Sequence, residues 1–270
     1  GRTYAEILDG LLDRIQEAFG DEQTEWIGFK QTWSEAFIAS FLNTWPDAKC
    51  IHIIRDPRAV LASWKRSSVL SHDYPALMIL RHWRKSAALA SLYSRRYENH
   101  RIVRFEDFTQ APEEQMRKIC EFCGLPFDEK TIDAAHFRSG SGSQWTSNTS
   151  YQVEEQGISK QYISAWKDRL SDEELQFVED LCGLEMERMG YARETGGSDP
   201  GSILHPPCIT RQVQAQVEWV NKFAAEYDLN SANQAKELCR WLLHRHRLEY
   251  NSTLSREDLR RIFIDPDLLS

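Results

Sequence analysis

The 270-residue sequence lacks any run of about 18 consecutive apolar residues, the length that a membrane-spanning helix needs. It also lacks an excess of positive charge, because 41 acidic residues against 33 lysines and arginines give a net charge of −8. A general nucleic-acid-binding surface is therefore not expected. No secretory signal peptide is visible either. We expect a cytoplasmic protein without a membrane segment, with a Golgi or secretory setting left open.

The cysteines form neither a disulfide framework nor a zinc motif. Six cysteines are scattered along the chain, and the C-x-x-C pair of Cys120 and Cys123 falls within a helical pattern. A zinc site of this kind needs a second pair at a suitable spacing. The histidines also show no metal-ligand spacing. We therefore expect no metal site, and we interpret both cysteines as apolar helix residues.

One segment combines a buried strand, an arginine and a helix start. Cys50–Ile54 is an almost continuous apolar run, which is typical of a strand buried on both faces. Arg55 follows it, and then Asp56 and Pro57 suit a helix cap and a first helical residue. Ser63 comes about two turns into the predicted helix. A cation at the end of a strand, beside a helix N-terminus, is typical of phosphate sites in open α/β sheets.

Arg55 and Ser63 are therefore candidate ligands for a phosphorylated nucleotide. The planar guanidinium of Arg55 can grip a phosphate with two hydrogen bonds, and the Ser63 hydroxyl can reach the same anion. The alternative is that Arg55 pairs with a carboxylate at the sheet edge while Ser63 faces solvent. The complete pattern of strand, Arg-Asp-Pro, helix and serine favours the nucleotide.

This segment resembles the 3′-phosphate-binding motif of sulfotransferases that use 3′-phosphoadenosine 5′-phosphosulfate (PAPS). In that family an arginine ends a strand and a serine eight residues later completes the grip on the 3′-phosphate, positions that Arg55 and Ser63 occupy here. Further similarity follows downstream in the family's order, in residues 104–108, 111–113, 119–127, 143–150, 158–159 and 166–170. The resemblance runs from about Trp26 to Tyr191.

The resemblance implies a PAPS-dependent sulfotransferase. Such an enzyme moves a sulfuryl group to a hydroxyl or amine of a small-molecule, carbohydrate or peptide acceptor, and leaves PAP as the product. The resemblance assigns Lys30 to stabilising the leaving group, since related enzymes carry a lysine at the corresponding strand end. It also assigns Ser143, Trp145 and Asn148 to the loop that contacts the cofactor. No metal is required by this chemistry.

Two departures from the family pattern concern the phosphate loop and the general base. The family's loop of the type Pro-Arg/Lys-Ser-Gly-Thr-Thr has no match between Gly1 and Lys49, so we expect this loop and its strand to lie outside the sequence given. Cytosolic members place a catalytic histidine two residues after the lysine, where this chain has Thr32. The sequence therefore does not identify the general base; a carboxylate in the expected upstream segment and, more locally, Glu35 are candidates.

Two other functions remain open. A nucleotide-kinase-like enzyme would share the expected architecture, but its G-x-x-x-x-G-K-[ST] loop does not occur in the chain. A non-catalytic, sulfotransferase-like interaction domain would use the C-terminal helices as its working surface. Preference for PAP over ATP with Mg²⁺ separates the first alternative from a sulfotransferase, and sulfation activity excludes the second.

Alternation of predicted strands and helices indicates an α/β fold with a parallel sheet. We expect a three-layer, nucleotide-kinase-like core over residues 1–192, followed by a linker and a helical extension over 193–270. Such an extension would pack on the core or build a homo-oligomer. The main predicted strands lie at 26–29, 50–55 and 101–105, and the main predicted helices at 34–44, 76–97, 112–123 and 171–189.

Overall fold

The computed structural model describes residues 3–21, 24–32, 34–66, 76–138, 143 and 158–196. In chain order its elements are α1 (Tyr4–Phe19), η1 (Glu35–Phe37), α2 (Ile38–Thr44), β1 (Cys50–Ile54), α3 (Pro57–Arg66), α5 (Ala76–Arg96), β2 (His100–Arg104), α6 (Phe105–Gln110), α7 (Pro112–Cys123), η2 (Glu129–Thr131), η3 (Ala134–His136), α8 (Gln161–Ser164) and α9 (Asp172–Arg188). The mixture of helices and strands confirms an α/β fold.

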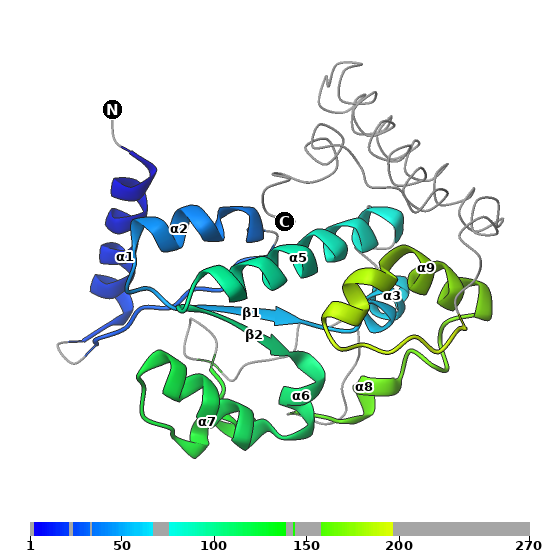
Figure 1. The fold of residues 1–270 in the computed structure, drawn as a ribbon. Helices are drawn as coiled ribbons and strands as arrows, with labels where there is room; N and C mark the ends of the chain where they lie inside the picture. Colours follow the sequence, from blue (N-terminus) through cyan, green and yellow to red (C-terminus); the bar gives the residue numbers. More distant parts are fainter. Residues whose placement is uncertain are drawn as a thin grey trace, which may run out of the picture.

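The two strands are parallel neighbours. Their register runs from Cys50 opposite His100 to Ile54 opposite Arg104. A parallel pair needs a long crossover, and α3 and α5 lie in the connection between these strands. Figure 1 shows α5 along one side of the strands, with α6 and α7 on the other side. Both strands therefore end at the same edge, where α3 and α6 begin.

The sheet differs from the sequence prediction in two respects. The described residues contain two strands, so the expected three-layer sheet is not established. The predicted strand at 26–29 is wrong, because this stretch pairs with no strand among the described residues. Gly28 weakens strand formation there, and Phe29 packs edge-on against Phe41 of α2 with ring centroids 6.0 Å apart. A short segment becomes a strand only where a neighbour accepts its hydrogen bonds.

The strand β1 is buried on one face rather than on both. His52 and Ile54 are buried, whereas the Ile53 side chain between them is 65% exposed. Successive side chains on a strand point to opposite faces, so the buried residues face the side of the sheet that is covered by packing. Apolar continuity in the sequence could not reveal that Ile51 and Ile53, on the other face, are exposed.

The hydrophobic core forms mainly between α5 and α9. Ile54 of β1 and Leu61 of α3 bury their side chains against these two helices. Small residues on α5 let the helices approach closely, and larger residues fill the space between them. The core members contributed by α5 and α9 are Ala76, Leu80, Trp83, Ala87, Ala90, Phe177, Val178, Leu181, Cys182 and Met186.

Local sequence signals set several helix ends as predicted. Thr3 and Ser171 form capping boxes with Glu6 and Glu174. Gly124 ends α7 with a φ of 71°, a left-handed conformation that glycine adopts without steric cost. The Gly124 and Ser171 caps agree with the predicted end of the helix at 112–123 and the predicted start of the helix at 171–189. The proposed extension over 193–270 lies outside the described residues from residue 197 onward.

Candidate functional site

Arg55 lies where the parallel strands end. It directly follows β1, and its guanidinium carbon sits 4.4 Å from the ring centroid of Phe105, the first residue after β2. Nη2 of Arg55 also donates to the carbonyl oxygen of Tyr162 in α8 at 3.2 Å. The half-buried guanidinium is thus oriented by an aromatic ring and a backbone carbonyl at the carboxyl edge of the sheet. A cation in this position suits an anionic ligand.

Asp56 caps α3 and holds a buried cation. Its Oδ1 accepts a hydrogen bond from the backbone N–H of Arg58 at 2.8 Å. Its Oδ2 forms an ion pair with Nη2 of Arg58 at 2.7 Å. The prediction of Asp56 as the helix cap is confirmed. Because this carboxylate already occupies the first turn of α3, anion binding at this edge depends on side chains rather than on the helix N-terminus.

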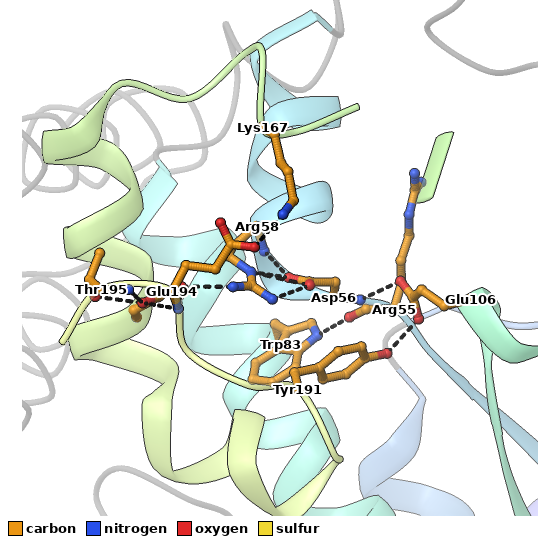
Figure 2. Close-up of polar contacts among 10 residues, drawn as sticks. Arg55, Asp56, Arg58, Trp83, Glu106, Lys167, Tyr191, Glu194 and Thr195 are labelled. Atoms are coloured by element: carbon orange, nitrogen blue, oxygen red, sulfur yellow. Dashed lines mark hydrogen bonds and ion pairs between the residues drawn. The ribbon is translucent and has the colours of Figure 1, made fainter. Parts of the chain in front are cut away.

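Arg58 connects this edge to α9. Its Nη1 lies 2.7 Å from Oε1 of Glu179, and its guanidinium carbon lies 4.1 Å from the ring centroid of Trp166. Glu179 also accepts hydrogen bonds from the backbone N–H groups of Glu194 and Thr195. Arg58 and Glu179 are both buried. The chain that follows α9 is therefore fastened to the edge by a polar network (Figure 2).

The residues matched by family comparison include this edge. Residues 4–129 match the sequence model described as Sulfotransferase family. This part of the chain is similar to the sulfotransferase family. The resemblance inferred from Arg55, Ser63 and the downstream stretches is thereby confirmed at the level of the family.

The sulfotransferase relatives share only part of their length with this chain. Carbohydrate sulfotransferase 7 of Mus musculus is 29% identical over 101 residues, which cover 37% of this chain and 20% of the relative. Carbohydrate sulfotransferase 3 of Mus musculus is 26% identical over 166 residues, covering 54% and 34%. Carbohydrate sulfotransferase 6 of Homo sapiens is 26% identical over 167 residues, covering 53% and 41%.

A solved sulfotransferase domain shares the fold. The sulfotransferase domain from the curacin biosynthetic pathway superposes with a TM-score of 0.53 at 15% identity, covering 68% of each chain. At this identity the likeness supports the α/β fold alone. In the part of the chain that the structure describes, no helix is both long and apolar enough to cross a membrane. The comparisons lend no support to the cytoplasmic location expected from the sequence.

The other predicted sulfotransferase site residues lie in different segments and differ in burial, and some lie outside the described residues. Ser63 is half-buried in α3, about two turns beyond Arg55. Lys30 is exposed in the unpaired stretch that precedes α2, and Ser143 is exposed. Trp145 and Asn148 lie outside the described residues. The contacts of all these side chains with a cofactor stay predictions.

Glu35, the local candidate for the general base, is not brought next to Arg55. It is buried in η1 and interacts electrostatically with Tyr93 of α5. Trp83, which does contact Arg55, lies ten residues earlier on the same helix. At 1.5 Å per residue, these two points on α5 are about 15 Å apart.

Three residues hold the Arg55 edge in place, and sequence patterns did not point to two of them, Trp83 and Tyr191. Trp83 donates its indole N–H to the carbonyl oxygen of Arg55 at 2.7 Å, and Glu106 accepts the N–H of Asp56 at 2.9 Å. Tyr191 donates its hydroxyl to Glu106 at 2.7 Å. The sequence signal near Tyr191 was the preceding Gly190, a residue typical of a helix end. In the structure Gly190 has a φ of 76° and follows α9. No local pattern pairs it with Glu106.

In the described part of the chain, no cluster of three or more His, Cys, Asp or Glu side chains has a geometry that could hold a metal ion. The groups that gather at the carboxyl edge of the strands are instead the guanidinium groups of Arg55, Arg58 and Arg104, backbone groups and two carboxylates that already have partners. Of these, the Arg55 guanidinium is the group suited to a phosphate.

Proposed function

We propose that the chain binds PAPS at the Arg55 edge and transfers its sulfuryl group to a hydroxyl or amine of an acceptor. The observation that carries this proposal is the position of the Arg55 guanidinium, at the carboxyl edge of two parallel strands in a sulfotransferase-family segment. The names of the relatives favour a carbohydrate acceptor. The proposed division into a core over 1–192 and an extension over 193–270 belongs to the same hypothesis.

The chemistry of the edge fits the 3′-phosphate of the cofactor. Arg55 supplies a fixed positive charge with several N–H donors, and Ser63 supplies a hydroxyl from the following helix. When bound, PAPS supplies the activated sulfuryl group. Lys30 would stabilise negative charge on the leaving phosphate, and Ser143, Trp145 and Asn148 would contact the cofactor from their loop. The proposed scheme uses no metal ion.

Replacing Arg55 by alanine tests the phosphate assignment. Arg55→Ala should weaken binding of PAP by about 1.5–3 kcal/mol, the range for hydrogen bonds to a charged group. Binding of adenosine 5′-phosphate, which lacks the 3′-phosphate, should be nearly unchanged. Calorimetric titration of both ligands into both proteins measures the difference.

Arg101→Ala is a matched control for this experiment. Arg101 of β2 also lies near a phenylalanine ring, 5.1 Å from the Phe122 centroid, and donates to the carbonyl of Lys118 at 2.6 Å. It lies towards the opposite end of the strand pair, so its loss should leave the preference for PAP intact. An equal loss of both ligands in Arg55→Ala would remove the 3′-phosphate assignment. Preferential binding of ATP with Mg²⁺ would favour the kinase alternative.

Lys30 is tested by turnover rather than by affinity. Lys30→Ala should lower kcat for sulfuryl transfer by about 100-fold, the scale observed when one charge-stabilising group is lost, while PAP affinity changes much less. Lys49→Ala, which removes another exposed lysine just before β1, should leave kcat close to that of the parent. Turnover with PAPS and a carbohydrate acceptor measures both. A Lys30→Ala protein with unaltered kcat would refute the assignment.

A further inference from the structure

The peptide bond between Arg55 and Asp56 is held at both ends. Its carbonyl oxygen, on Arg55, accepts the indole N–H of Trp83 at 2.7 Å. Its N–H, on Asp56, donates to Oε1 of Glu106 at 2.9 Å. Because a peptide unit is planar, two bonds on opposite sides fix its orientation. They therefore also fix the direction in which the Arg55 side chain leaves the backbone.

Glu106 is itself held by a residue from the far end of the described chain. Its Oε2 accepts the hydroxyl of Tyr191 at 2.7 Å, and both side chains are more than nine-tenths buried. Burial, together with the neighbouring Glu106 carboxylate, raises the pKa of Tyr191, so the phenol remains a neutral donor. Figure 2 shows Trp83, Glu106 and Tyr191 gathered around the start of α3.

We infer that Tyr191, acting through Glu106, positions Arg55 for the 3′-phosphate. The inference rests on the proposed function, and it makes Tyr191 a positioning residue that does not touch the nucleotide. Without the hydroxyl, Oε2 of Glu106 loses its donor inside the protein. Arg104 is the neighbouring cation whose charge interacts with Glu106. The carboxylate would then turn towards Arg104 and loosen its bond to the Asp56 N–H.

The segment after α9 is also connected to the Arg55 edge by a second set of polar contacts. Beyond Tyr191, the backbone N–H of Thr195 donates to Glu179 at 2.8 Å. Glu179 pairs with Arg58, and Arg58 holds the Asp56 carboxylate. The segment 191–195 thus bonds to Glu106, which holds the Arg55–Asp56 peptide, and to Glu179, which is connected to Asp56 through Arg58. The segment after α9 consequently limits how far the Arg55 side chain can move from the orientation that binds the 3′-phosphate.

The test is titration of Tyr191→Phe with PAP and with adenosine 5′-phosphate. Loss of one buried hydrogen bond should weaken PAP binding by about 3- to 10-fold, while adenosine 5′-phosphate changes by less than about 2-fold. A merely structural role would lower thermal stability and leave the ratio of the two affinities unchanged. Glu106→Gln, which keeps an acceptor but loses the charge, should reduce the same ratio.

Two further proteins make the result decisive. Tyr93→Phe removes the hydroxyl of a buried tyrosine near the other end of α5, and should leave both affinities unchanged. In the Arg55→Ala background, Tyr191→Phe should have no additional effect on PAP.

The outcomes separate the inference from the proposed function. If the parent protein does not prefer PAP, the proposed function fails and this inference fails with it. If the parent prefers PAP and Arg55→Ala loses that preference while Tyr191→Phe keeps it, the positioning role alone is overturned. The proposed function and the positioning role are both supported if Tyr191→Phe lowers the ratio of PAP affinity to adenosine 5′-phosphate affinity in the parent but not in the Arg55→Ala background.

Discussion

Replacing Arg58 by alanine should lower the free energy of unfolding by about 3–5 kcal/mol, the usual cost of removing one partner from a buried ion pair. The guanidinium holds two carboxylates at 2.7 Å, those of Asp56 and Glu179. Arg58 and Asp56 are each 5% exposed and Glu179 is fully buried. Alanine would leave two negative charges inside the protein without their shared cation. Urea unfolding followed by circular dichroism measures the loss.

Arg14→Ala provides the matched surface substitution. Arg14 pairs with Glu17 at 2.8 Å, but its side chain is 79% exposed. Exposed pairs of this kind contribute about 0.2–1 kcal/mol, so the expected change is small. An Arg58→Ala protein that loses no more stability than Arg14→Ala would contradict the importance of the buried pair.

A second comparison separates the charge of Arg58 from its packing. Arg58→Met keeps much of the apolar stem that lies against Trp166, whose ring centroid is 4.1 Å from the guanidinium carbon. Adding Glu179→Gln removes one of the two carboxylate charges that lose their partner when Arg58 is replaced. The double variant should therefore be more stable than Arg58→Met alone, because an uncharged amide is cheaper to bury than an unpaired carboxylate. Lower stability of the double variant would show that the backbone bonds to Glu179 matter more than its charge.

Local sequence signals predicted the elements that form through near neighbours. The apolar run at 50–54 placed β1, Asp56 with Pro57 placed the start of α3, and Gly124 placed the end of α7. Such signals act over one or two turns of chain and need no knowledge of the fold. Local signals also identified Arg55 as a candidate phosphate ligand, because it lies between a predicted strand and a predicted helix start.

Contacts between distant residues could not be predicted in this way. Arg58 and Glu179 are 121 residues apart in the chain, and Glu106 and Tyr191 are 85 apart. A charged residue on a predicted helix is normally solvent-exposed, so no sequence pattern indicated that Arg58 is buried. The strand predicted at 26–29 failed for the related reason that strand formation depends on a partner elsewhere in the chain.

Acidification should destabilise the protein between pH 6.5 and 4 because of a buried histidine pair. His52 Nε2 lies 2.8 Å from the hydroxyl of Ser86, and His52 Nδ1 lies 3.4 Å from Nε2 of His100. Both imidazoles are more than nine-tenths buried. Burial lowers the pKa of each to about 4, and the neighbouring His100 contributes to the shift of His52.

The direction of the pH effect follows from where protons bind. In the unfolded chain both histidines have a pKa near 6.5, whereas the folded protein keeps them neutral down to about pH 4. Their stabilising contribution is therefore complete above pH 6.5 and is lost as the pH falls towards 4. One such group accounts for a loss of about 3 kcal/mol at pH 4.

Carboxylates contribute in a lower pH window, which lets the histidines be measured separately. Burial opposes ionisation of Glu179, but its hydrogen bonds from Glu194, Thr195 and Arg58 outweigh this and hold its pKa below the usual value of 4.5. Its contribution is lost only as the pH falls below that value. The change in stability between pH 6.5 and 5 therefore reports mainly on His52 and His100.

Substitution of the pair tests this assignment. A protein with both His52→Asn and His100→Asn should be less stable at pH 7.5 but should show a much flatter dependence between pH 6.5 and 5. His136→Asn, made at a histidine that is exposed and bound to Asp133, should keep the slope of the parent. Urea unfolding at half-unit pH intervals gives both slopes. If the double variant loses stability on acidification as steeply as the parent, the buried pair is not the source of the acid sensitivity.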